Sequence, residues 1–294
     1  MSERRRVRVT GATPTRLDAC VRALAPELSR RLVRTLIDDG AVLVNGRPGR
    51  KGTRVADGDV VELPALAALE PEPDLPLRVL YEDARMIAID KPGGVRGHAL
   101  DPRQRGTMAA ALLARHPELA TVGDPLAAGL VHRLDIGTSG VLVAARSAEA
   151  HRALRAAFRS HAVTKRYVAV VVGTPAAGTI VDAALAHDSR DRRRMRVAQA
   201  TDRAWSARTL VVAVEPRGER SLIEIEIRTG VTHQVRVHLA HLGHPIVGDA
   251  LYGTPCDALA PRRHALHARR LEVPAYGLRI EAPIPDDLLG LVRA

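Results

Sequence analysis

HRLDIGTSG, at residues 132–140, carries the strongest structural and chemical signal in this 294-residue chain. Asp135 ends an apolar run and stands directly before a turn rich in glycine, threonine and serine. Taken alone, an aspartate in this position is a turn former, because its carboxylate accepts hydrogen bonds from the next backbone amides. Whether Asp135 has a further role must be decided from the sequence on both sides of this string.

Four further strings accompany it in a definite order. They are IAIDKPGG at 87–94, KRYVAVVVG at 165–173, RTGVTHQVRVHLAHLGHPIVGDALYG at 228–253 and HALHARRLEVP at 264–274. Their apolar runs predict strands, and GLVHRLD at 129–135 is expected to be another strand that leads into the GTSG turn. The chemistry-bearing residues are therefore expected at strand ends and in the turns that follow them.

Periodicity in the same region predicts more strands than helices. Ile223, Ile225 and Ile227 alternate with charged residues, as in a strand with one exposed face. Ser147 and Thr232 are each placed to cap a helix that follows them. Because strict alternation of strand and helix is missing, we predict an α+β fold with a large mixed, mainly antiparallel sheet flanked by helices.

The length of the chain, about twice that of a typical domain, favours two domains. Residues 65–76 hold three prolines and three acidic residues, which predicts a stiff, extended linker. We therefore expect a small domain over 1–64 and a large domain over 77–294. In the small domain, apolar spacing predicts one helix from Arg16 and a second helix capped by Ser29.

The charge balance narrows the class of partner. The chain has 44 lysines and arginines against 33 acidic residues, a formal net charge of +11. This excess favours a polyanion, either nucleic acid or an anionic membrane surface. Gly173, Pro175 and Gly178 interrupt the longest uncharged apolar stretch, so no spanning helix is expected. Neither a secretory signal nor a disulfide framework is present, and we expect a cytoplasmic protein without membrane contact.

Several other chemistries find no support in the sequence. Neither a P-loop nor a nucleophile-elbow motif occurs. His233, His238, His241 and His244 resemble a metal cluster, but no HExxH pattern or cysteine partner accompanies them. A polar or RNA-facing helix is the favoured interpretation, and no metal is expected.

The small domain concentrates basic side chains on one helix and the hairpin after it. The candidates for RNA contact are Arg30, Arg31, Arg34, Arg47 and Lys51. Alone, such a group is typical of a solvated surface. The string from RLDACVRAL to DGDVVEL, however, resembles the S4 RNA-binding domain over residues 14–64. That resemblance implies that the helices and the adjoining loop bind RNA.

The five strings of the large domain, in their order, closely resemble the RluA-type family of RNA pseudouridine synthases. The S4-like domain in front makes the ribosomal large-subunit members of that family the most similar. The resemblance implies an isomerase that converts uridine to pseudouridine, which requires no cofactor. It further implies that Asp135 is the catalytic carboxylate and that Arg236 pairs with it.

Other roles follow from the same resemblance. Arg133 is associated with displacing the target nucleotide from its stack, and Tyr167 with packing on the flipped uracil. Leu134 and Val235 are expected to form apolar walls of the base pocket. The sequence departs from the usual family pattern at Val231, at Arg96 and at the pair Ile136-Gly137. These departures affect the expected RNA contacts more than the reaction type.

Alternative functions remain open at this point. A synthase acting on transfer RNA would share every catalytic residue. A non-catalytic RNA-binding protein would have no need of Asp135, Tyr167 and Arg236 together. A glycosidase would require a second carboxylate across the bond, and none accompanies the motif. We therefore expect an RNA partner, most of all ribosomal RNA, and take a monomer as the working assumption for the oligomeric state.

Overall fold

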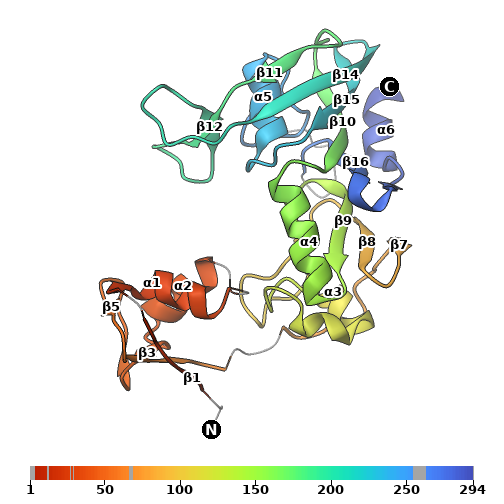
Figure 1. The fold of residues 1–294 in the computed structure, drawn as a ribbon. Helices are drawn as coiled ribbons and strands as arrows, with labels where there is room; N and C mark the ends of the chain where they lie inside the picture. The colour runs from red at the N-terminus through yellow and green to blue at the C-terminus, as the bar shows by residue number, and fades with distance from the viewer. Residues whose placement is uncertain are drawn as a thin grey trace.

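A computed structural model describes residues 4–11, 13–26, 28, 30–65, 69–253 and 263–293 (Figure 1). The N-terminal module, red to orange in Figure 1, lies beside the remainder of the chain, which is built around one large sheet. Of the described helices, none is long and apolar enough to cross a membrane.

The module combines two helices with short strands. Its elements are β1 (Arg5–Arg8), β2 (Thr15–Arg16), α1 (Leu17–Leu24), α2 (Arg30–Asp38), β3 (Leu43–Val44), β4 (Arg47–Pro48), β5 (Arg54–Val55) and β6 (Val60–Leu63). Four strands form one sheet in the order β1-β6-β3-β4, and β2 pairs with β5. Both expected helices are present, although Ser29 lies outside the described residues.

The apolar positions of the two helices form the core of the module. Leu17 and Val21 from α1 pack with Val33 and Ile37 from α2, and all four are buried. This leaves the other side of α2 to charged residues. The helices are therefore held by burial of one face, which is the usual source of helical stability in proteins.

A nine-stranded sheet is the centre of the large domain. Its strands are β7 (Val79–Glu82), β8 (Met86–Lys91), β9 (Ser139–Ala145), β10 (Thr164–Val172), β11 (Ile180–Asp182), β14 (Arg208–Arg217), β15 (Arg220–Ile227), β16 (Leu266–Val273) and β17 (Leu278–Glu281). Eight of them follow the order β11-β14-β15-β10-β16-β9-β8-β7, and β17 pairs with β16. The predicted alternation is confirmed, because Ile223, Ile225 and Ile227 are buried between half-buried neighbours.

One pairing in this sheet is parallel. The two-residue register of β16 with β9 joins His267 to Ser139 and Ala268 to Gly140. Gly140 has a φ of 110°, and a Cβ there would collide with the carbonyl of Ala268. The other strand pairs are antiparallel. The predicted α+β fold with a mixed, mainly antiparallel sheet is therefore confirmed.

Helices and a hairpin surround the sheet (Figure 1). They are α3 (Met108–Arg115), η1 (Pro117–Thr121), α4 (Ala148–Arg159), α5 (Gln234–His241), η2 (Pro274–Tyr276), α6 (Asp286–Arg293) and the pair β12 (Leu185–His187) and β13 (Met195–Val197). Ser147 caps α4 as predicted, because its hydroxyl accepts a hydrogen bond from the Ala150 amide. The prediction for Thr232 is wrong. The N-cap of α5 is His233, whose side chain makes no capping bond.

The expected strand over residues 129–135 is not formed as such. Only Leu130 makes an isolated bridge, to Ala144, and residues 132–135 have irregular backbone. The His132 imidazole instead accepts a hydrogen bond from the Val143 amide and stacks on Phe158. The apolar run is thus buried beside β9 without a ladder of its own. Asp135 then follows in irregular backbone.

The segment predicted to link the two domains contacts the large domain. Leu69 and Leu77 are buried in the core of that domain. The Glu72 amide donates to the carbonyl of Ala110 on α3, and the Glu72 carboxylate accepts from the Gly106 amide. Residues 69–77 are therefore packed along α3.

Candidate active site

Asp135 lies in a short loop between the 129–131 segment and β9. Its Oδ2 accepts a hydrogen bond of 3.0 Å from Nη1 of Arg236, the third residue of α5. The Asp135 side chain is 19% exposed, whereas that of Arg236 is 6% exposed. The predicted pairing of these two residues, 101 positions apart in the sequence, is thus present in the structure. One face of the carboxylate remains open to solvent.

A second carboxylate fixes the guanidinium. Nε and Nη2 of Arg236 donate to the two oxygens of Asp249 at 2.7 and 2.8 Å. Asp249 is fully buried, which alone would raise its pKa, but the paired arginine outweighs burial and holds that pKa below its usual range. The Tyr252 ring also lies 5.1 Å from the guanidinium carbon of Arg236. These contacts fix the orientation of the Arg236 guanidinium, whose Nη1 is directed at Asp135.

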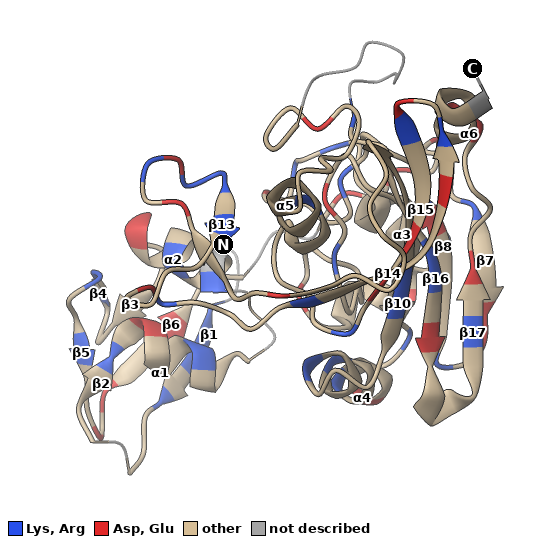
Figure 2. Ribbon diagram, turned by 90° about the horizontal axis from the view of Figure 1, so that it is seen from above, with Lys and Arg blue, Asp and Glu red and all other residues tan. Residues whose placement is uncertain are grey.

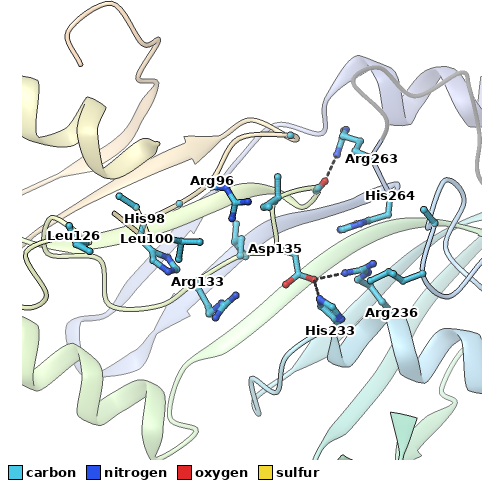
Figure 3. Close-up of a pocket in the computed structure, with 18 of the residues that line it drawn as sticks. Arg96, His98, Leu100, Leu126, Arg133, Asp135, His233, Arg236, Arg263 and His264 are labelled. Carbon is cyan, nitrogen blue, oxygen red and sulfur yellow. Dashed lines mark hydrogen bonds and ion pairs between the residues drawn. The ribbon is translucent and has the colours of Figure 1, made fainter. Parts of the chain in front are cut away.

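His233 contacts the same carboxylate. Its Nε2 lies 3.8 Å from Oδ2 of Asp135, and its Nδ1 lies 2.8 Å from the hydroxyl of Tyr252. Figure 3 shows His233 and Arg236 both directed at Asp135, with Arg133 on a neighbouring part of the loop. Burial lowers the pKa of His233, the largest effect on that group, so the imidazole is neutral near pH 7.

A pocket of about 420 Å³ opens beside Asp135. Tyr167 from β10, Leu134 and Val235 line it, and all three are buried. Burial, with a further contribution from the charge of Asp135, raises the pKa of the Tyr167 phenol far above its usual value. The structure brings both predicted apolar walls and the predicted aromatic residue to the pocket that contains Asp135. Arg133 is exposed at the rim.

A larger hollow of about 940 Å³ lies on the other side of the loop. Arg96 and His98 line it, together with Leu32 and Thr35 from α2 of the N-terminal module. Arg96, one of the departures from the family pattern, thus lies at the candidate site (Figure 3). Arg133, Leu134, Asp135, His233 and Arg236 line both spaces, so Asp135 stands between them.

Buried polar groups beneath the loop hold its backbone. The Lys91 ammonium donates to the carbonyls of Pro92, Val95 and Ile136 at 2.7 to 3.1 Å. Lys91 is fully buried, and burial lowers its pKa to about 7. Thr138 shares a hydrogen bond of 2.8 Å with His264. The loop around Asp135 is therefore tied to distant parts of the sequence on both sides.

The predicted RNA-contact residues of the module separate into two groups. Arg30, Arg34 and Lys51 are exposed and line one groove of about 560 Å³. Arg47 is exposed on β4, outside that groove. The side chain of Arg31 lies outside the described residues.

Figure 2 shows how basic residues are distributed over the molecule. They occur on α2 of the module and again at the tip of the β12–β13 hairpin, which projects toward the same side of the large domain in Figures 1 and 2. The hairpin tip has the sequence DSRDRRR at residues 188–194. Basic residues thus occur on two separate projections, in addition to those on α4 and the large sheet.

The histidines that resembled a metal cluster have separate partners. His238 is buried and bonded to Thr209 and the Ala183 carbonyl, whereas His244 bonds to the Val172 carbonyl. Within the described part of the chain, no three His, Cys, Asp or Glu side chains are placed to hold a metal ion. Val231, another of the departures from the family pattern, is half-buried against an apolar cluster below the β12–β13 hairpin.

Sequence reasoning missed three residues of this arrangement. Asp249 and Tyr252 lie in GDALYG, at the end of the string at 228–253, and the sequence pattern gives them no role of their own. Lys91 lies in IAIDKPGG and likewise receives no role from the pattern. The available signal was the presence of charged or polar residues inside otherwise apolar strings, because a buried charge requires a partner.

Comparison with known proteins places this geometry in a family. Residues 85–241 match the RNA pseudouridylate synthase family, and residues 15–61 match the S4 domain. The chain belongs to the RNA pseudouridylate synthase family. The match covers Asp135, Tyr167 and Arg236, and the chain is accordingly an RNA-modifying isomerase.

Relatives of this synthase are similar along nearly the whole chain. A protein named ribosomal large subunit pseudouridine synthase D from Xylella fastidiosa is 41% identical over 97% of this chain and 90% of its own length. An RNA pseudouridine synthase from Chloroflexus aurantiacus is also 41% identical, over 96% of this chain and 90% of its own. Both the S4 domain and the synthase domain are therefore shared with these relatives.

Two solved structures are similar to about three quarters of this chain. Human RNA pseudouridylate synthase domain containing 4 superposes with a TM-score of 0.58 at 25% identity, covering 74% of this chain and 93% of its own. Human RNA pseudouridylate synthase domain containing 1 gives the same score and identity over 77% and 98%.

Proposed function

We propose that this synthase isomerises specific uridines in structured RNA, with Asp135 as the catalytic carboxylate and large-subunit ribosomal RNA as the substrate. The observation that carries the proposal is the contact of Asp135 with Arg236 beside the pocket lined by Tyr167. The name of the relative from Xylella fastidiosa supplies the substrate class.

The reaction is an exchange of one bond for another within a single nucleotide. The N1–C1′ bond of uridine breaks, the uracil turns, and C5 bonds to C1′. C5 then loses its proton and N1 gains one, so the product is an isomer of the substrate. A carboxylate can serve by attacking C1′ or by accepting a proton from C2′. Both routes use Asp135 as a carboxylate, and the permanently charged Arg236 is its partner at 3.0 Å.

The pocket has the size and lining for one extruded base. Tyr167 offers an aromatic face, while Leu134 and Val235 provide apolar walls. Taking a base out of its stack costs a few kcal/mol, so the vacated space must be filled or the base held firmly. Arg133 is exposed at the rim and next but one to Asp135, which suits it to occupy that space.

We further propose a division of labour between domains. Residues 1–64 grip RNA through the groove that Arg30, Arg34 and Lys51 line, with Arg31 and Arg47 adding charge around it. Residues 77–294 carry the chemistry, and 65–76 connect the two. Basic side chains suit this task because phosphate contacts supply much of the affinity for nucleic acid.

The test is Asp135→Asn in the full chain. The amide has almost the same shape but can neither attack C1′ nor accept a C2′ proton, so pseudouridine formation is expected to be abolished while RNA binding is retained. Pseudouridines are mapped after incubation with ribosomal RNA from cells that lack the enzyme, with transfer RNA as a parallel substrate. Asp182→Asn, at an exposed position of β11, is the matched control.

Turnover by Asp135→Asn, in protein shown by mass spectrometry to be free of deamidation, would remove Asp135 from the catalytic role. Modification of transfer RNA alone would overturn the assignment of the substrate.

A further inference from the structure

His233 contacts Asp135, but the proposed reaction gives this histidine no role. His233 lines both spaces around Asp135, and its side chain is 15% exposed. Its Nε2 and the Nη1 of Arg236 approach the same oxygen, Oδ2. Within the described part of the chain, no hydrogen bond is directed at Oδ1. That oxygen is therefore the one left to meet a substrate.

The hydrogen bonds behind His233 determine which ring nitrogen carries its proton. The Tyr252 oxygen accepts a hydrogen bond of 2.7 Å from the Met195 amide. Its own hydroxyl proton can then be donated to Nδ1 of His233, at 2.8 Å. A neutral imidazole that accepts at Nδ1 carries its proton on Nε2. The N–H of His233 consequently points toward Asp135.

The backbone of His233 has an unusual conformation. Its φ is 57°, in the left-handed region that residues other than glycine seldom adopt. Such a conformation persists only where surrounding contacts impose it. The ring packs edge-on against Tyr252 with centroids 5.6 Å apart. The strain turns the imidazole inward at the point where α5 begins.

From these contacts we propose that His233 is a positioning residue, whose Nε2–H holds Oδ2 of Asp135 and leaves Oδ1 to react, with Tyr252 fixing the tautomer. This role rests on the proposed function of Asp135. The distance of 3.8 Å exceeds a hydrogen bond, and contacts of this kind commonly shorten when the substrate binds. Arg236 supplies the positive charge that balances the carboxylate of Asp135. His233 fixes which oxygen of that carboxylate faces the substrate.

The test compares single-turnover rates at saturating enzyme for variants of the full chain. His233→Asn keeps a residue that tolerates the left-handed backbone but is too short to reach Asp135. His233→Gln restores an N–H near the position of Nε2. We expect the Asn variant to react about tenfold more slowly or worse, a barrier change of about 1.4 kcal/mol, and the Gln variant to recover part of the rate. RNA affinity should change by less than about twofold.

Tyr252→Phe tests the tautomer. Alone it should slow the reaction severalfold, because Nδ1 no longer has its donor. Combined with His233→Asn it should slow the reaction no further, since the tyrosine acts through the histidine. His241→Asn, at an exposed position of the same helix, is the control for histidine and Tyr276→Phe the control for tyrosine.

An unchanged rate in His233→Asn overturns the proposal, as do effects that multiply in the double variant, because either result means that His233 does not orient Asp135. A purely structural role would lower the rates of the Gln and Asn variants equally and would shift their melting temperatures together. Failure of the proposed function is a separate outcome, since it is seen only as activity in Asp135→Asn.

Discussion

Arg236 holds two carboxylates with different ends of one guanidinium. Nε and Nη2 engage Asp249 in a buried pair, and Nη1 is left for Asp135. A lysine has no such fork, so it could satisfy only one of these partners with fixed geometry. At the scale of the residue, the orientation of Asp135 thus depends on Asp249, which lies 114 positions further along the chain. Asp249 acts on Asp135 only through Arg236.

Removing that acid should therefore affect both stability and activity. Asp249→Ala leaves a buried guanidinium without its buried partner and with only the more exposed Asp135 beside it, and breaking a buried pair in this way costs about 3–5 kcal/mol. The measurement is urea denaturation, together with a single-turnover assay at a temperature where the variant is folded. The rate should fall because Arg236 is no longer aimed at Asp135.

Asp191→Ala is the contrasting variant, since Asp191 pairs with an Arg193 side chain that is 80% exposed. An exposed pair contributes little to stability, because water and salt screen it. Equal destabilisation by the two substitutions would mean that burial does not distinguish them.

The sequence could supply Asp135 and Arg236 only because they lie in strings that resemble a family. Their pairing across 101 positions has no local signal. Asp249 was beyond reach for a different reason. An aspartate after a glycine is typical of a turn, and only the three-dimensional structure shows that this one is fully buried against Arg236.

At the scale of the element, Lys91, the last residue of β8, connects that strand to the loop around Asp135. Its ammonium joins the turn after β8 to the carbonyl of Ile136, next to Asp135. Burial lowers the pKa of Lys91 to about 7 from an ordinary value of 10.5. Between these two values the unfolded chain holds a proton that the folded protein does not. Stability contributed by Lys91 therefore rises with pH across that interval and is lowest below pH 7.

Lys91→Met removes this dependence. The free energy of unfolding of the natural chain minus that of Lys91→Met should increase from about pH 7 to about pH 10, measured by urea denaturation at several pH values. Lys51→Met, at an exposed position, should change stability near pH 7 by less than about 0.5 kcal/mol. A difference between the natural chain and Lys91→Met that is constant with pH would show that Lys91 is not held in a desolvating site.

Two elements differ from the sequence prediction for reasons that lie outside local sequence. Thr232 has the side chain of a helix cap, but α5 begins one residue later than expected, after His233, whose backbone is left-handed and whose side chain makes no capping bond. The run at 129–135 has the composition of a strand, yet it pairs with β9 only around the bridge of Leu130 with Ala144, and the His132 side chain then takes the Val143 amide. Strands with clear alternation, such as β15, were predictable because burial of one face determines them.

At the scale of the molecule, the net positive charge favours an RNA partner. The basic side chains of the N-terminal module are expected to bind that RNA. Arg30→Ala/Arg34→Ala should weaken RNA binding and flatten the plot of log K against log salt by roughly 0.7–0.9 for each phosphate that the variant no longer neutralises. Binding is measured by filter retention or fluorescence anisotropy over a range of salt. The reaction of RNA that is already bound should keep its rate.

The control variant is Arg78→Ala/Arg279→Ala, which removes the same charge beside β7 and β17, away from the module (Figure 2). It should leave the salt slope nearly unchanged. If both double variants flatten the slope equally, binding reflects total charge and not a groove on α2.

The contacts that fix the loop around Asp135 have a consequence for biosynthesis. Arg263, His264 and His267 bind the stretch from Gly137 to Ser139, and Arg263 is itself clamped by Asp287. A growing chain that has released Asp135, Tyr167 and Arg236 from the ribosome still lacks these supports. The support of this loop thus comes from segments that are synthesised after all three of these residues, namely the start of β16 with the residues before it and α6.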